Sequence, residues 1–187
     1  MKFPQKDVDS LVATIEGAGK TIEQQAGDEL AAVAIYDHAF FDRVRTTINE
    51  EKAADLHKKV WVMRVIDSVN EAKEELNVAE IDTIPTLGLM AKAAFERRGC
   101  IVEVNDVRLD YFAADVTCDP LFELAGPLNN EAVGGAYMNS LAAALEEIIP
   151  EMVEQSGMGD TVEAKLVSSL FTGDEKTSFT FEKKAGC

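Results

Sequence analysis

The sequence is poor in basic residues. It has 18 lysines and arginines against 34 aspartates and glutamates, so its formal net charge is −16. A surface of this sign repels phosphate backbones and anionic lipids. We therefore expect neither nucleic acid nor a membrane surface as a partner, and we interpret the acidic charge as a solubility feature.

Cysteines are few and lie far apart in the sequence. Cys100, Cys118 and Cys187 are odd in number and form no CxxC pair. This spacing argues against a disulfide framework and against a thiolate zinc site. Reduced thiols in a cytoplasmic protein fit it best.

Long apolar runs are also missing. The longest, Leu30 to Tyr36, has seven residues, whereas a membrane-spanning helix needs about 20. Near the start of the chain, Asp7 and Asp9 interrupt any apolar signal core. We expect a cytoplasmic chain with no secretion signal and no membrane crossing.

Proline is absent from residues 28–77, where apolar residues recur at helical spacing. The pattern predicts two helices that break near Asn49, with Trp61, the only tryptophan, near the core. A short helix is expected at residues 8–15 and a further one from Pro85 to Gly99.

The pattern changes to strands at Cys100. Residues 100–118 read as a hairpin with its turn at Asn105-Asp106. A helix is expected from about residue 133 or 137 to 155, kinked or ended early by Pro150. A second hairpin follows, with strands at 161–171 and 177–183.

These elements predict an α+β fold. A helical part at residues 1–99 precedes a ββαββ part at residues 100–187, with an antiparallel sheet that has helices on one face. We expect one domain over residues 1–187. A two-fold homodimer is also expected, because the helical half carries more apolar stripe than four strands can cover.

The stretch Gly17 to Thr21 resembles the end of a phosphate-binding loop. Thr14 stands where such a loop has its first glycine, and the preceding residues read as a helix rather than a strand. We interpret the stretch as a helix end with a linker.

Histidine is scarce, with only His38 and His57. Asp42 follows His38 by one helical turn, but no ExxH or HExxH pattern supports a metal site. A partly packed helical histidine is the interpretation that we favour, and no cofactor-binding residues are identified. A Ser-His-Asp or Cys-His relay stays open, since its members need only meet in space.

Cys118 is the best single nucleophile candidate. It ends a strand just before Asp119-Pro120, and strand ends often carry site residues. An inert buried thiol is the alternative.

A strand that ends in Cys118-Asp119-Pro120 is followed by a long helix and by a last hairpin that contains Gly173-Asp174 and Phe179. With these features the stretch from Ile101 to Glu182 resembles the L-2-amino-thiazoline-4-carboxylic acid hydrolase family and, more distantly, the 4-vinyl reductase-type small-molecule-binding domains. In those families a strand ends in Cys-Pro and the last hairpin carries Gly-Asp, two residues, Cys, one residue and Phe. Here Asp119 is inserted after Cys118, and Thr177 stands at the late cysteine position. The matching hairpin residues are Gly173, Asp174, Phe179 and Phe181.

The resemblance implies a domain that encloses a small-molecule pocket. One function is hydrolysis of a cyclic C–N bond in a small heterocyclic carboxylate, with Cys118 as nucleophile or polar anchor and Asp174 or Asp119 as base or positioning group. A second is non-catalytic ligand sensing, in which these residues line the pocket. A third, independent of the resemblance, is partner binding through the acidic helices.

Overall fold

The computed structural model describes residues 22–123 and 134–186. The helix expected at residues 8–15 and the Gly17 to Thr21 stretch therefore lie outside the described residues. By their contacts the residues divide into one unit before Ala34 and another from Ala34 onward. That residues 1–187 form one domain stays a prediction.

The two long helices are present, and they break where the sequence predicts. Helix α2 spans Ile22–Thr47 and α3 spans Glu50–Glu75. Between them the Asn49 side chain accepts a hydrogen bond from the Lys52 amide at 2.7 Å, which caps the first turn of α3.

Helix α4 begins and ends as its sequence signals indicate. It spans Ile84–Glu96, is capped by the Thr83 hydroxyl and carries Pro85 in its first turn. Gly99 has φ of 82°, a conformation that glycine adopts without strain, and the first strand follows. None of the described helices is long and apolar enough to cross a membrane.

The first hairpin is confirmed, but the predicted position of its turn is wrong. Strands β1 (Ile101–Arg108) and β2 (Tyr111–Cys118) are joined by a two-residue loop. The register shifts between Val104 and Asp106, so Asn105 is the extra residue of a bulge. Asparagine suits a bulge as well as a turn, which explains the error.

Helix α6 spans Gly134–Gln155, so its expected end at residue 155 is confirmed. The helix continues through Pro150, so the alternative that this proline ends the helix early is wrong, while a kink there stays a prediction. Proline removes one backbone donor from the helix. The last turn is nevertheless held in place, because Met152 and Val153 are buried in the core.

The second hairpin consists of β3 (Val162–Ser168) and β4 (Thr177–Lys183). Strand β3 ends earlier than predicted, because a short 3-10 helix, η1 (Leu170–Thr172), takes up the expected strand end. The Ser169 hydroxyl caps this turn by accepting the Phe171 amide hydrogen bond.

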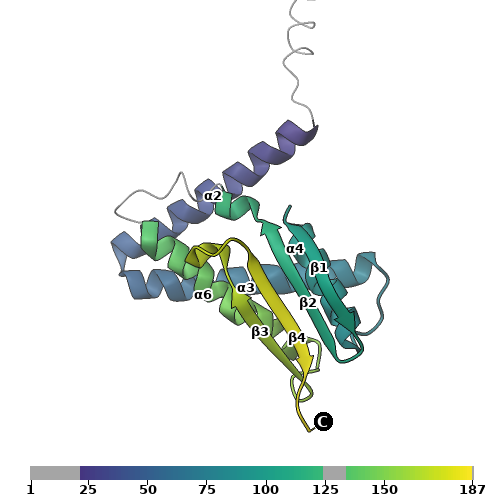
Figure 1. Cartoon of the computed structure of the whole chain (residues 1–187). Helices are drawn as coiled ribbons and strands as arrows, with labels where there is room; N and C mark the ends of the chain where they lie inside the picture. The colour runs from purple at the N-terminus through teal and green to yellow at the C-terminus, as the bar shows by residue number, and fades with distance from the viewer. Residues whose placement is uncertain (1–21, 124–133, 187) are drawn as a thin grey trace, which may run out of the picture. The chain divides into compact units, whose positions relative to one another are not determined.

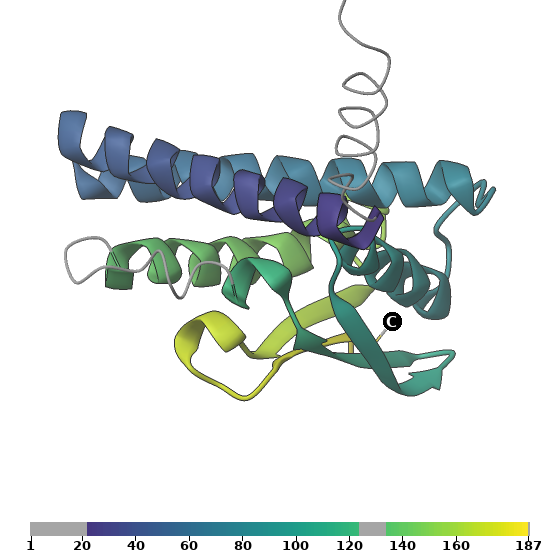
Figure 2. The ribbon, with the colours of Figure 1, turned by 90° about the horizontal axis from the view of Figure 1, so that it is seen from above.

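The described strands form one antiparallel sheet in the order β1-β2-β4-β3 (Figure 1). Helices α3, α4 and α6 lie on the same side of this sheet (Figure 2). Helices α4 and α6 contact the strands, and α3 packs on both of those helices. The predicted α+β class is therefore confirmed.

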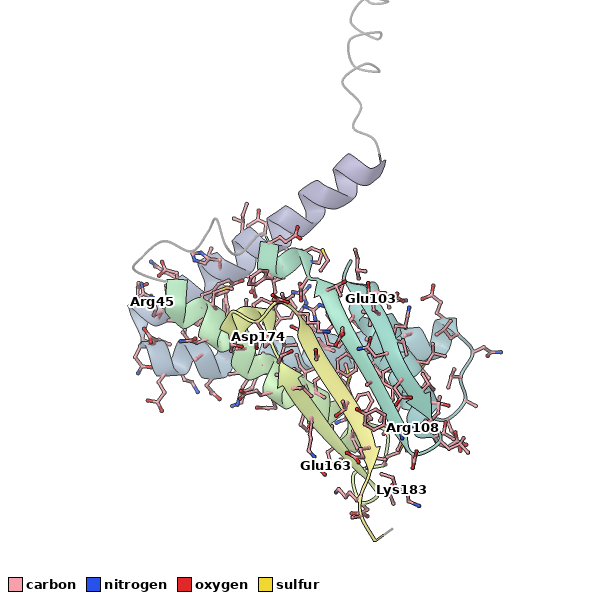
Figure 3. The ribbon with its side chains drawn as sticks, in the orientation of Figure 1. Arg45, Glu103, Arg108, Glu163, Asp174 and Lys183 are labelled. Atoms are coloured by element: carbon pink, nitrogen blue, oxygen red, sulfur yellow. The ribbon has the colours of Figure 1, made fainter. Side chains whose placement is uncertain are left out.

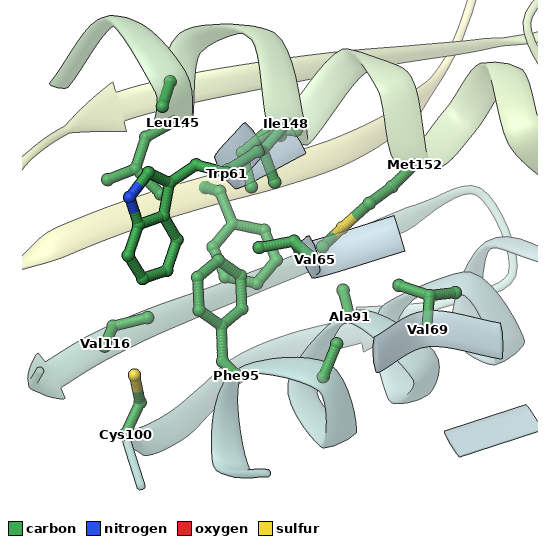
Figure 4. Close-up of a cluster of buried hydrophobic side chains, with 14 of the residues drawn as sticks. Trp61, Val65, Val69, Ala91, Phe95, Cys100, Val116, Leu145, Ile148 and Met152 are labelled. Atoms are coloured by element: carbon green, nitrogen blue, oxygen red, sulfur yellow. The ribbon is translucent and has the colours of Figure 1, made fainter. Parts of the chain in front are cut away.

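The core lies between the helices and the sheet (Figure 4). Phe112, Phe179 and Phe181 project from β2 and β4 with their rings 5.6–6.2 Å apart. Phe95 of α4 packs on Phe179 at 5.5 Å. Trp61 is 4% exposed, which confirms its predicted place near the core.

Gly88 is where α4 approaches the sheet most tightly. A Cβ atom at this position would overlap the Phe112 ring. We expect Gly88→Ala to lower the free energy of unfolding by about 1–3 kcal/mol, the usual effect of overpacking, despite alanine's helix preference of up to about 1 kcal/mol.

The matched control is Gly135→Ala in α6, because a Cβ atom there meets nothing within 4 Å. This change should leave stability unchanged or raise it by a few tenths of a kcal/mol. Urea unfolding measures both variants. Equal stability of Gly88→Ala and the wild type would contradict the close approach.

Candidate functional site

Cys118 lies at the end of β2 and is half-buried. Its thiol donates a hydrogen bond to the Glu123 carboxylate at 3.4 Å. Burial raises the pKa of the Cys118 thiol, and the bond to Glu123 and the charges of Glu123 and Asp119 raise it further. A thiol in this setting stays protonated near neutral pH, which makes it a poor nucleophile.

Asp119 is buried and caps the helical turn that follows β2. Its carboxylate accepts the Leu121 amide hydrogen bond at 2.9 Å. It also lies near Cys100, whose pKa is raised to about 12 by burial and by the Asp119 charge. The Asp119 carboxylate therefore holds the turn after β2, and its charge raises the pKa of the Cys100 and Cys118 thiols.

Asp174 holds the loop between η1 and β4. It accepts hydrogen bonds from the Ser169 amide at 2.8 Å and the Thr172 hydroxyl at 3.2 Å. Figure 3 shows Asp174 beside η1, at the end of β4 away from Lys183. Among the described residues no hydrogen bond joins Asp174 to Cys118, so a joint role of these two residues stays a prediction.

A cleft of about 220 Å³ opens between α3, the segment that leads into α4, and the end of α6. Buried and half-buried apolar side chains form its floor, and mostly exposed polar side chains form its rim. The floor consists of Ile66, Val69, Ile81 and Met152, and the rim of Asn70, Lys73, Glu80, Asp82, Gln155 and Ser156.

Only some of the rim side chains form hydrogen bonds or ion pairs with the residues that the structure describes. The Gln155 amide donates to Glu151 at 2.7 Å, and the Ser156 hydroxyl donates to the Val153 carbonyl at 2.7 Å. Lys73, Glu80 and Asp82 form no ion pair or side-chain hydrogen bond with the described residues. A wider hollow beside the cleft shares Asn70 and Lys73 with it.

A buried polar network joins three helices. From α2, the Asp37 carboxylate accepts hydrogen bonds from the Tyr137 hydroxyl at 2.7 Å and the Trp61 indole at 3.2 Å. The same oxygen lies 2.8 Å from Nε2 of His57. On its other side, Nδ1 of His57 lies 2.7 Å from the Ser140 hydroxyl.

The order of groups in this network is that of a Ser-His-Asp relay, the arrangement that the sequence left open. His57 is 0% exposed and Ser140 is 2% exposed, so no substrate reaches the hydroxyl in this conformation. Burial alone would raise the pKa of Asp37, but the hydrogen bond and charge of His57 and the bonds from Tyr137 and Trp61 lower it. Burial and the Asp37 charge raise the pKa of Tyr137.

Sequence reasoning missed both the cleft and this network. One signal for the cleft was present, because Ile66, Val69, Asn70 and Lys73 recur at i, i+3, i+4 and i+7. This spacing places them on one helix face.

No local signal in the sequence marks the Asp37 network, because Asp37 and Tyr137 are 100 residues apart. The described residues hold no group of three or more His, Cys, Asp or Glu side chains placed to bind a metal ion.

Comparison with known proteins gives a match in fold alone. No protein-family model matches the sequence, and no curated protein matches it. The chain is similar to a trafficking protein particle complex subunit 3 from Naegleria fowleri, covalently bound to palmitic acid. The TM-score is 0.50 at 13% identity, over 83% of this chain and 95% of that one.

A second solved structure is more distant. It is the phenol-responsive sensory domain of the transcription activator PoxR with phenol, with a TM-score of 0.47 at 12% identity. The match covers 82% of this chain and 74% of that one. The Naegleria fowleri structure supports the α+β fold, while membership of the thiazoline-carboxylate hydrolase family is not confirmed.

Replacing Asp37 should destabilise the protein, because its carboxylate accepts the Tyr137 and Trp61 hydrogen bonds and contacts Nε2 of the buried His57. We expect Asp37→Asn to lower the free energy of unfolding by about 2–3 kcal/mol at pH 7. Since the folded-state pKa of Asp37 is lowered from 3.8, this contribution is fully present above the unfolded-state pKa. It is lost as the pH falls below about 4 through the folded-state pKa.

Urea unfolding between pH 7 and pH 3 measures this difference. Asp42→Asn is the control, because Asp42 lies on the same helix in an ion pair with Arg45 that is partly exposed. It should cost less than about 1 kcal/mol. If the two variants lose equal stability, the buried network does not hold the helices together.

Proposed function

We propose that this protein binds a small molecule non-covalently in the cleft between α3 and α6 and carries out no reaction on it. The observation that supports this function is the composition of the cleft. Ile66 and Ile81 are half-buried and offer apolar surface, and Lys73, Glu80 and Asp82 are charged groups that no described residue engages. Ligand sites typically combine an apolar lining with a few polar groups that fix orientation.

The volume of the cleft limits the size of the ligand. At about 220 Å³ it is smaller than the roughly 300–1,000 Å³ of sites for drug-sized molecules. We therefore expect a ligand with one small apolar body rather than a nucleotide or a long chain. The adjoining hollow leaves room for a substituent that projects past Asn70 and Lys73.

The structural relative from Naegleria fowleri supports ligand binding only in a general way, since its bound palmitic acid is an example of this fold holding an organic molecule. In that protein the palmitic acid is bound covalently, whereas the ligand that we propose for this cleft is bound non-covalently. Neither Cys100 nor Cys118 lines the cleft.

Hydrolysis of a cyclic C–N bond stays a prediction. It would need Cys118 as a thiolate, whereas burial and two neighbouring carboxylates raise the pKa of this thiol. It would also need Asp119 or Asp174 as a base, and both carboxylates accept backbone hydrogen bonds that hold local turns. The contacts of these three residues favour the binding function over the catalytic one.

The cleft hypothesis predicts that filling the cleft abolishes binding. We expect Asn70→Trp to remove the thermal stabilisation given by fragments that bind the wild type, because the indole would occupy the ligand's space. A ligand at 100 times its dissociation constant adds about 2.7 kcal/mol, which raises the melting temperature by several degrees.

The matched control is Asp67→Trp, which adds the same side chain to an exposed position of α3 outside the cleft. The measurement is a thermal-shift screen of small acids, amines and amino acids against the three proteins. Fragments that stabilise Asn70→Trp as much as Asp67→Trp do not bind in this cleft.

Self-association is a second function that a specific observation favours. Ile35, Tyr36 and Phe40 of α2 are 52%, 76% and 44% exposed, which is unusual for three neighbouring large apolar residues. Residues 34–47 contain two aspartates and two arginines, so this stretch is neutral in a chain of charge −16. Two copies would meet here with the least repulsion, and we propose a two-fold dimer through this face.

The dimer hypothesis predicts a mass of twice 20.4 kDa in light scattering, and a return to the monomer mass in Tyr36→Asp. Ile48→Asp is the control, since Ile48 is 60% exposed outside this neutral stretch. A wild type that remains monomeric at about 100 μM protein in high salt, where charge repulsion is screened, would exclude the dimer.

A further inference from the structure

The cleft between α3 and α6 carries charges of both signs that have no ion-pair partner among the described residues. Lys73 is supplied by α3, whereas Glu80 and Asp82 are supplied by the segment before α4. Most lysines that the structure describes form ion pairs, but Lys73 does not, although two carboxylates line the same cleft. The paired lysines are Lys52, Lys58, Lys59, Lys92, Lys165 and Lys176.

Lys73 is separated from Glu80 and Asp82 because it lies on a different backbone segment. Lys73 lies in the last turn of α3, and Glu80 and Asp82 follow after the helix has ended. Neither carboxylate forms an ion pair with Lys73. The apolar floor, including Ile81, lies in the same cleft as both charges.

We propose that the ligand of this cleft is a small zwitterion with an apolar body, such as a free hydrophobic amino acid. Its carboxylate pairs with Lys73, its ammonium group pairs with Glu80 and Asp82, and its side chain lies on Ile66 and Ile81. This inference rests on the proposed function, because it names the ligand class of the same cleft.

The alternative ligand classes each leave a charge unmatched. A simple carboxylate would pair with Lys73 but would meet two carboxylates and the field of a chain with charge −16. A simple amine would pair with Glu80 and Asp82 but would be repelled by Lys73. A zwitterion is neutral overall and pairs with both groups, and each partly exposed ion pair raises the affinity by up to about fivefold.

The test compares ligands that differ in charge but share one apolar body. The first set is L-phenylalanine, 3-phenylpropanoate and 2-phenylethylamine, and the second is L-leucine, 4-methylpentanoate and 3-methylbutylamine. Isothermal titration at pH 7 and low salt gives the dissociation constants. We expect at least one amino acid to bind the wild type about two- to fivefold more tightly than either of its one-charge analogues.

Charge-removing variants assign each contact. In Lys73→Met the amino acid should bind no more tightly than its amine analogue, and in Asp82→Asn its advantage over the carboxylate analogue should shrink. Lys183→Met and Asp67→Asn are matched controls, because both residues lie outside the cleft. The controls should retain wild-type preferences, and circular dichroism verifies that all variants are folded.

The outcomes separate the ligand class from the proposed function. If each one-charge analogue binds as tightly as its amino acid, or if Lys73→Met matches Lys183→Met, the zwitterion proposal is overturned while binding in the cleft stands. Failure of all six probes to bind the wild type also overturns it. The proposed function itself fails only if no fragment distinguishes Asn70→Trp from Asp67→Trp.

Discussion

The carboxylate of Asp37 is the interaction on which the arrangement of the helices depends. Three polar groups from two other helices converge on one of its oxygens, so the carboxylate fixes the part of α2 from Ala34 onward against α3 and α6. A buried charge is costly unless it is fully hydrogen-bonded. The network therefore stabilises one relative placement of these helices and disfavours placements that would leave the charge unpaired.

This placement also determines the geometry of the cleft. His57 contacts Ser140 near the beginning of the helix pair, and Val69 lines the cleft with Met152 near its end. The two residues of each pair are separated by the same number of positions in the sequence. Residue numbers therefore rise together along α3 and α6, so the two helices run in the same direction. The two sites are about three helical turns apart, and packing of α3 on α6 between them transmits the placement from one site to the other.

The elements of the fold were predictable from the sequence because their signals are local. The break at Asn49 and the start at Pro85 follow from capping chemistry, and both are confirmed. The errors arose where one residue type suits two structures or where the core overrides a local preference. Asn105 occupies a bulge instead of a turn, and α6 continues past Pro150 because its last turn is buried.

Much less of the candidate site was predictable. The place of Cys118 at a strand end followed from its sequence context, but its bond to Glu123 did not. The acids singled out with it, Asp119 and Asp174, hold turns, and aspartate at such positions serves local backbone bonds as readily as chemistry. The cleft and the Asp37 network require helices to meet in space, and no short motif encodes that.

The shared direction of α3 and α6 has an electrostatic consequence. Each peptide unit carries a dipole along the helix axis, so a helix ends in a partial negative charge of about half an elementary charge. The cleft lies where both helices end, at Glu75 and Gln155. The backbone itself therefore adds two partial negative charges to this end of the helix pair, and Lys73 is the cation that lies closest to them along α3.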